Sequence, residues 1–290
     1  LGIASIPFAS FLYGITVGKY NFKVIKQTLF FPDLPEAFDG TTITHISDVH
    51  SGSFDDADKI QYAIDLINDQ NSDMVLFTGD IVNTHATEMD PWITTFKGIH
   101  NPKFGKFSIL GNHDYGDYMD WETDQEKINN LQNLKKIQRE MGYKLLLNEN
   151  DFIKKNGERL AILGVENWGA GGFKKVGDLN KAIEGISDSD FKILLTHDPS
   201  HWRNKVIPHN YFFPLTLSGH THGMQFGIDI PGWIKWSPIK WRYPEFAGLY
   251  KKAKQYLYVN RGFGYLAYPG RVGMWPEITV LTLKKSKIEV

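Results

Sequence analysis

Short apolar runs bounded by Gly, Asp or Pro recur along the chain. Such runs are typical of buried β-strands. We predict strands over residues 41–47, 74–78, 107–110, 160–165, 192–196, 215–218, 256–259 and 278–283. The pattern indicates a protein built around β-sheets.

Between several of these runs the apolar positions follow a helical period. Apolar residues at 60, 63, 64 and 67 share one helix face, and carboxylates at 55, 56 and 58 lie where a helix N-terminus favours negative charge. We also predict a helix through residues 128–141 that ends before Gly142, and a short helix over 178–184. Strands alternating with helices, followed mostly by strands, indicate a layered α/β sandwich of mixed sheets.

The N-terminal stretch has a different composition from the rest of the chain. Residues 1–17 carry no charge, and lysines follow at positions 19, 23 and 26. A membrane-spanning helix takes about 20 apolar residues, slightly more than this stretch provides. We keep two interpretations of segment 1–19, the end of a membrane helix or a buried or interfacial helix. No linker interrupts residues 20–290, which we predict to form one domain.

Composition narrows the chemistry that the chain can perform. With 42% hydrophobic residues and a net charge of −1, the 290-residue chain is globular, and it lacks the Lys/Arg excess expected of a protein whose main partner is nucleic acid. The absence of cysteine excludes thiolate metal sites, disulfides and Cys nucleophiles. Any metal must therefore be bound by His, Asp, Asn or Glu.

Five polar motifs each follow a predicted strand directly. They are Asp48-Val49-His50, Gly79-Asp80, Gly111-Asn112-His113-Asp114, His197-Asp198 and Gly219-His220-Thr221-His222-Gly223. Functional residues of open α/β sheets gather beyond the carboxyl ends of the strands, so we expect these motifs to meet at one edge. The pooled candidate ligands are Asp48, His50, Asp80, Asn112, His197, His220 and His222. Seven N/O ligands are too many for one zinc ion, and they suit two cations that share a carboxylate.

In this combination and order, the motifs resemble those of the calcineurin-like metallophosphoesterases, whose pattern is Asp-X-His, Gly-Asp, Gly-Asn-His-Asp/Glu, a His, and Gly-His-X-His. The resemblance runs from about residue 42 to residue 283. It implies a four-layer α/β/β/α sandwich of two mixed sheets and a catalytic domain over 20–290. It also implies two divalent metal ions, Mn, Fe or Zn, and a phosphate-ester substrate.

The resemblance also implies a role for each matching position. Asp48, His50 and His222 would hold the first metal, and Asn112, His197 and His220 the second. Asp80 would bridge the two.

Beside these ligands, the resemblance makes His113 a catalytic imidazole that protonates the leaving oxygen after a metal-bridging hydroxide attacks phosphorus. Many members carry an Asp that pairs with this imidazole where this chain has Asn83. Asp114 would then orient His113, or its side chain would cap the following turn.

Other residues suggest the substrate. Arg261 follows a predicted strand and would either bind a substrate phosphate or pair with a carboxylate. Segment 226–250 has neither a helical nor a strand pattern, and it mixes Trp and Pro with Lys and Arg. We interpret it either as a membrane-interface rim or as an ordinary packed loop. The apolar N-terminus favours membrane association.

Three functions follow from these features. The first is hydrolysis of a phosphodiester or pyrophosphate bond in a lipid-linked or nucleotide-lipid substrate, similar to the UDP-2,3-diacylglucosamine pyrophosphatases. The second is a broad-specificity phosphomonoesterase or cyclic-nucleotide phosphodiesterase. The third is a metal-stabilised binding protein without turnover, which the presence of a non-ligand imidazole at position 113 disfavours.

Overall fold

The computed structural model of the chain describes residues 2–230 and 232–286. Its first sheet has the strand order β1 (Lys23–Phe31), β14 (Glu277–Lys285), β2 (Thr42–Ile46), β3 (Met74–Phe77), β4 (Lys106–Ser108), β5 (Tyr143–Leu145). Strands β2 to β5 are parallel, as are β1 and β14, whereas β14 and β2 are antiparallel. The sheet is therefore mixed.

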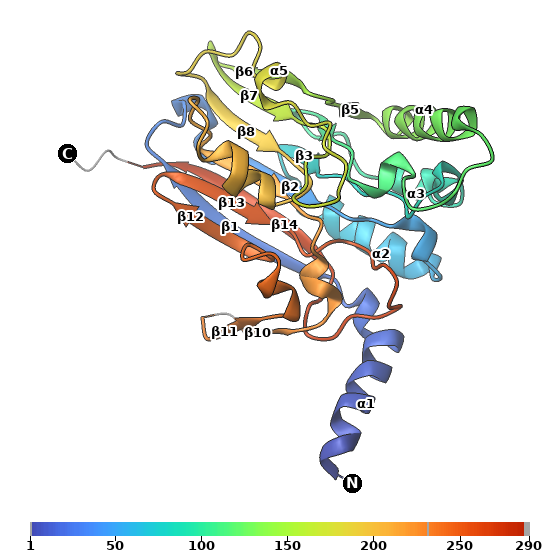
Figure 1. Cartoon of the computed structure of the whole chain (residues 1–290). Helices are drawn as coiled ribbons and strands as arrows, with labels where there is room; N and C mark the ends of the chain where they lie inside the picture. Colours follow the sequence, from blue (N-terminus) through green and yellow to red (C-terminus); the bar gives the residue numbers. More distant parts are fainter. Residues whose placement is uncertain (1, 231, 287–290) are drawn as a thin grey trace.

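The second sheet lies face to face with the first (Figure 1). Its order is β12 (Gly248–Lys252), β13 (Gln255–Val259), β9 (Leu215–Ser218), β8 (Phe191–Leu195), β7 (Glu158–Gly164), β6 (Glu149–Lys155). The four central strands are parallel, and both outer pairings are antiparallel. Alternate side chains of each strand point into the space between the sheets, where Ile43, Leu76 and Ile193 belong to one buried cluster.

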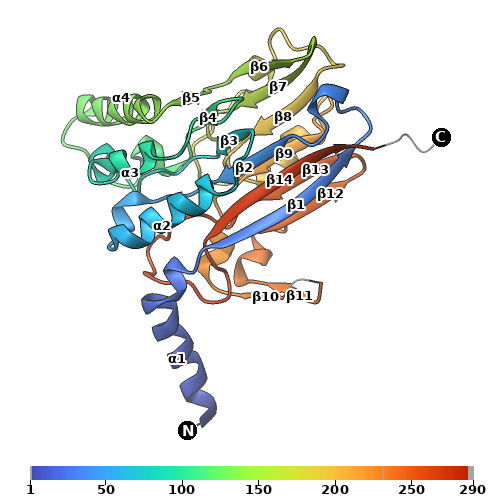
Figure 2. The same ribbon diagram turned by 180° about the vertical axis from the view of Figure 1, so that it is seen from behind.

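Helices cover the two outer faces, which gives four layers (Figures 1 and 2). Helices α2 (Ala57–Asn68), α3 (Ile93–Lys97) and α4 (Asp124–Glu140) pack on the first sheet, and α5 (Leu179–Ala182) with a π-helical turn (Trp202–Val206) packs on the second. Helix α2 buries Ile60, Ile64 and Ile67, the face that the sequence pattern predicts, and Asp56 caps its N-terminus. The α/β/β/α sandwich is thus confirmed.

The eight predicted strands are present, but the sequence pattern missed others. Strands β1, β5, β6 and β12 gave no clear signal, and neither did the small hairpin of β10 (Ile228–Ile230) and β11 (Ile234–Trp236). The prediction that segment 226–250 contains no strand is therefore wrong. Strands of three residues are too short to establish an alternating pattern, and β1 is an edge strand with only two buried positions.

The N-terminal segment forms helix α1 (Gly2–Thr16), which projects from the body of the protein (Figure 1). Its C-terminal half packs on the loop after β13, because Phe11 and Tyr13 contact the rings of Tyr268 and Trp275. Within the described part of the chain, no helix combines the length and apolar character needed to cross a membrane.

Candidate metal centre

Five of the predicted ligands have a left-handed backbone. The φ angles are 52° at Asp48, 48° at His50, 59° at Asp80, 72° at His220 and 50° at His222. Each such conformation costs a non-glycine residue about 1–2 kcal/mol, and strain of this kind concentrates at functional sites. The loops that leave β2, β3 and β9 are therefore shaped to aim these side chains inward.

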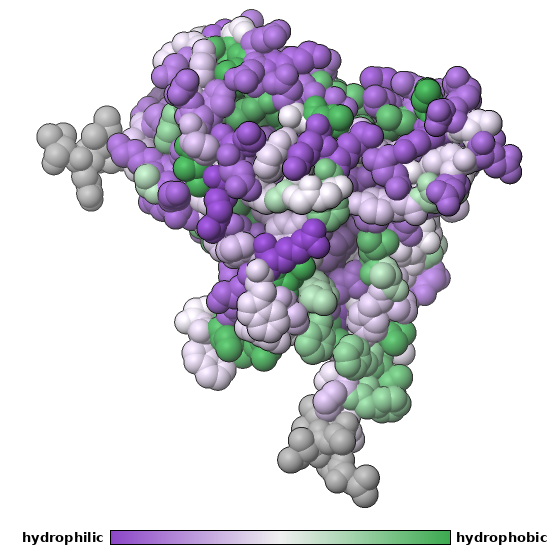
Figure 3. Space-filling view, in the orientation of Figure 1, coloured by the Kyte–Doolittle hydropathy of each residue, from purple (hydrophilic) through white to green (hydrophobic). Residues whose placement is uncertain are grey.

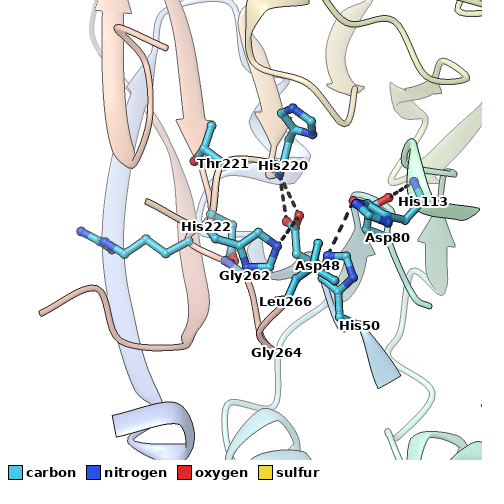
Figure 4. Close-up of polar contacts among 12 residues, drawn as sticks. Asp48, His50, Asp80, His113, His220, Thr221, His222, Gly262, Gly264 and Leu266 are labelled. Atoms are coloured by element: carbon cyan, nitrogen blue, oxygen red, sulfur yellow. Dashed lines mark hydrogen bonds and ion pairs between the residues drawn. The ribbon is translucent and has the colours of Figure 1, made fainter. Parts of the chain in front are cut away.

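Asp48, His50 and His222 form the first group, which follows β2 and β9. One donor atom from each of Asp48, His50 and His222 lies within 4.8 Å of the others. Both oxygens of Asp48 also accept the backbone N–H of His220 at 3.0 Å, so the carboxylate ties the two loops together (Figure 4).

A second group contains Asp80, His197 and His220 at the same spacing. The Oδ2 atom of Asp80 lies 2.9 Å from Nε2 of His197 and 3.7 Å from Nε2 of His50. One carboxylate oxygen is therefore within reach of both groups, as a bridging ligand requires.

Glycines allow these groups to approach closely. A Cβ atom at Gly219 would lie 2.1 Å from Oδ2 of Asp48, and one at Gly111 would lie 2.1 Å from Oδ1 of Asp80. Any side chain at either position would displace a carboxylate. Gly219 and Gly111 are thus explained by close packing against Asp48 and Asp80.

Unpaired buried atoms test whether the residues fit two cations. Nε2 of His50, Nε2 of His222 and Oδ1 of Asn112 are buried without a hydrogen-bond partner. Leaving such atoms unpaired is costly, and each is a ligand atom type that divalent cations accept. The N/O donor set and these atoms fit a dinuclear centre.

The protonation states of three histidines also suit metal binding. Burial lowers the pKa of His50 to about 3 and that of His220 to about 4, and it places the pKa of His222 well below its usual range. These rings are therefore neutral near pH 7, the form that ligates metals.

His197 behaves differently from these three. Burial lowers its pKa, but Asp80 and Asp48 outweigh that effect and raise the pKa of His197 to about 10. In the absence of a cation, a proton on His197 thus offsets part of the charge of the two carboxylates.

Side chains behind the ligands were not predicted. Nδ1 of His50 donates to Oδ1 of Asn83 at 3.0 Å, and Nδ1 of His197 donates to the Thr78 carbonyl at 2.7 Å. Nε2 of His220 contacts the hydroxyl of Tyr243 at 2.9 Å, and that hydroxyl donates to Asp198 at 3.2 Å. Tyr243 lies about 20 residues from the nearest motif, so no local signal identifies it.

A fully buried arginine, Arg271, lies behind the first group and contacts His222. Nη2 of Arg271 donates to Nδ1 of His222 at 3.0 Å, and its guanidinium also donates to backbone carbonyls of the loop after β13, including that of Gly264. Burial lowers the pKa of Arg271 to about 9. No sequence motif pointed to Arg271.

The imidazole of His113 lies beside both groups. Its backbone N–H donates to Oδ1 of Asp80 at 2.8 Å, and its ring lies edge to face with His50, with 5.0 Å between ring centroids. Nδ1 donates to the carbonyl of Asn83 at 2.8 Å, and the ring stacks on Tyr118. A carbonyl only accepts, so the ring proton is on Nδ1 and Nε2 is left for other chemistry.

Asp114 does not orient His113. Its carboxylate is buried and accepts the backbone N–H groups of Asp80, Ile81 and Gly111 at 2.8–2.9 Å. The expected pairing is corrected: the backbone of Asn83 orients His113, and Asp114 joins the loops after β3 and β4.

Arg261 lies outside both groups. It forms ion pairs with Asp229 and with the buried Glu277. Pairing with a carboxylate was one of the two alternatives for Arg261. The structure shows this pairing, with two carboxylates instead of one.

Similarity to known proteins covers most of the chain. Residues 41–224 match the family model described as calcineurin-like phosphoesterase. An uncharacterized metallophosphoesterase of Bacillus subtilis, YkuE, is 31% identical over 90% of this chain and 84% of that protein. An uncharacterized metallophosphoesterase of Aquifex aeolicus is 24% identical over 91% of this chain and 93% of that protein.

A longer relative is also similar. A transmembrane protein with metallophosphoesterase domain from Danio rerio is 26% identical over 95% of this chain. The chain spans 60% of the length of that protein.

Proposed function

This chain belongs to the calcineurin-like phosphoesterase family of metal-dependent phosphoester hydrolases, and from that premise we propose that it hydrolyses a phosphodiester or pyrophosphate bond. The observation that carries the proposal is the position of Asp80, whose Oδ2 lies within reach of both histidine groups while its Oδ1 holds the backbone of His113.

We assign the ligands by group. Asp48, His50 and His222 would hold one divalent cation, and His197, His220 and Asn112 the other, with Asp80 shared. Bound there, Mn, Fe or Zn ions would supply Lewis-acid charge to the phosphoryl oxygens and lower the pKa of a water.

His113 would supply the proton for the leaving oxygen. Because Nδ1 is committed to the Asn83 carbonyl, the ring presents Nε2 to the substrate, and protonated Nε2 can donate to the departing oxygen. Tyr118 limits rotation of the ring by stacking on it, with 4.3 Å between centroids. Asn112 is held by the same tyrosine, since its Nδ2 donates to the Tyr118 hydroxyl at 2.7 Å.

We further propose that the substrate is lipid-linked and that the protein works at a membrane. Two observations support this extension, the apolar helix α1 and the word "transmembrane" in the name of the longer relative. Broad phosphomonoesterase or cyclic-nucleotide phosphodiesterase activity is the alternative.

A substrate comparison tests the proposal. The full chain with Mn²⁺ is assayed on a bis-aryl phosphodiester, an aryl monophosphate, a cyclic nucleotide and a lipid-linked UDP-sugar. We expect the diester and the UDP-lipid to give the highest kcat/KM. A faster monophosphate or cyclic nucleotide would establish the alternative, and no turnover with both cations bound would refute phosphoesterase function altogether.

A further inference from the structure

One end of the protein exposes large apolar side chains from two separate segments. The side chains of Trp233 and Trp241 are 81% and 82% exposed, and that of Phe8 is 67% exposed. Trp241 follows the β10–β11 hairpin, and its ring contacts Trp236 of β11. We define the end face as these three exposed residues together with other exposed apolar side chains from residues 11–17 and from the hairpin: Phe11, Leu12, Tyr13, Val17, Ile228, Ile230 and Ile234. Single exposed apolar residues are ordinary, but a gathered set marks an interaction site.

The two segments lie at the same end of the molecule. Figures 1 and 2 place α1 and the hairpin side by side below the sandwich. The ring of Phe11 stacks on Phe226, which precedes β10, with 5.7 Å between centroids. In Figure 3 the apolar colours gather over this end, whereas the upper part of the same view is mostly hydrophilic.

Charge around the end face has one predominant sign. Residues 1–23 contain two lysines and no acid, although Lys19 is buried and ion-paired with Asp55, so Lys23 carries the free charge of this segment. Residues 226–242 contain Lys235, Lys240 and Arg242 with Asp229 as the sole acid. Asp229 is neutralised by its ion pair with Arg261. Lys23, Lys240 and Arg242 are exposed. Exposed Trp next to Lys and Arg matches the headgroup region of an anionic bilayer, whereas the cores of protein–protein interfaces are depleted of Lys.

Resting on the membrane location proposed above, we propose that the end face docks on the surface of a bilayer that contains anionic lipids. The tryptophans and the aromatic side chains of α1 enter the interface, and the cations remain at headgroup level. Both apolar insertion and electrostatic attraction are present, the two contributions that stable peripheral binding requires.

The docked face has a fixed relation to the metal centre. The Tyr268 hydroxyl donates to the Phe11 carbonyl at 3.0 Å, and the backbone N–H of Arg271 donates to the Gly14 carbonyl at 3.2 Å. The guanidinium of the same Arg271 contacts His222. One loop therefore joins α1 to a candidate metal ligand and holds the metal centre at a set height above the lipid.

Vesicle binding tests the inference without any need for turnover, so its failure is distinguishable from failure of the proposed reaction. The full chain is mixed with phosphatidylcholine vesicles with and without phosphatidylglycerol and sedimented. We expect binding that depends on the anionic lipid. The double variant Trp233→Ala/Trp241→Ala is expected to bind at least about tenfold more weakly, and Lys23→Glu/Lys240→Glu about tenfold more weakly on anionic vesicles.

The matched control is Phe30→Ala/Ile128→Ala, which removes exposed apolar side chains from the far end of β1 and from α4. It is expected to bind like the unmodified chain. Unchanged thermal unfolding and metal content confirm that the variants fold.

Three results would overturn the inference: no binding of the unmodified chain to either vesicle, equal binding by the tryptophan variant, or self-association that this variant abolishes in the absence of vesicle binding. The last would assign the end face to a second copy of the chain.

Discussion

The two ligand groups share Asp80 but differ in what lies behind their histidines. Behind His222 in the first group is the guanidinium of Arg271, a buried cation. Behind His220 in the second group are the Tyr243 hydroxyl and then the Asp198 carboxylate. A carboxylate behind a ligating imidazole raises its basicity, whereas a cation lowers it.

The same contacts determine which ring nitrogen carries the proton in His220 and in His222. Nε2–H of His220 donates to Tyr243, so the lone pair of this ring is on Nδ1, which lies 3.3 Å from Nε2 of His197. A guanidinium only donates, so Nδ1 of His222 accepts and a neutral ring carries its proton on Nε2, the atom that faces Asp48 at 3.4 Å. A cation held through Nε2 of His222 would have to displace that proton. From this contrast we predict that the second group would bind its ion more tightly and that the first ion would exchange more readily.

Removal of the shared ligand Asp80 is expected to have the largest effect on metal content and turnover. Asp80→Ala is expected to lose at least one metal ion and to reduce kcat by roughly 10⁴-fold, because both ions lose a ligand and their separation is no longer fixed. Elemental analysis and steady-state assays measure the two effects. Retention of two ions with normal turnover would show that Asp80 does not bridge.

Removal of the imidazole separates chemistry from metal binding. His113→Asn is expected to reduce kcat by about 10²–10³-fold while both ions stay bound, because His113 donates a proton and is not a ligand. Metal content equal to that of the unmodified protein is the control. If kcat is unchanged, His113 is not the general acid.

His45, a buried histidine outside both groups, shows how burial changes the pKa of a histidine that is not a candidate ligand. His45 lies between the sheets with Nδ1 unpaired, and burial lowers its pKa to about 3. An unfolded His binds its proton near pH 6.5, so stability is complete above that pH and is lost as the pH falls towards the folded value. We expect this one side chain to account for about 2 kcal/mol of destabilisation between pH 7 and pH 5.

The check is chemical denaturation of metal-free protein at both pH values. His45→Leu should show a smaller drop in unfolding free energy between pH 7 and pH 5 than the unmodified chain, by that same amount. Equal drops would mean that His45 is protonated in the folded protein.

The variant with the smallest expected effect tests the predicted difference in metal affinity between the two groups. Tyr243→Phe removes the hydroxyl that orients His220 and is expected to weaken the tighter ion about tenfold, with kcat nearly restored at saturating metal. Chelator titration followed by metal analysis measures this affinity, and Tyr211→Phe, a half-buried tyrosine away from the groups, is the control. Two ions of equal affinity in the unmodified chain would contradict the contrast.

The sequence by itself determined the layered fold and the candidate ligand set. Apolar periodicity is local and follows from burial, so α2 and the eight predicted strands could be located without knowledge of their neighbours. Each candidate ligand follows a strand, and the carboxyl ends of parallel strands meet at one edge, so Asp48 and Asp80 could be placed together before any coordinates were known.

Only the tertiary structure decided which partner each polar side chain takes. Asp114 binds backbone amides, Arg261 pairs with two carboxylates, and Arg271 and Tyr243 back the histidines. These contacts join residues that are distant in sequence or meet a backbone whose direction is set by left-handed turns. Hydrogen bonding depends on atomic distance and direction, which a linear pattern of residue types does not contain.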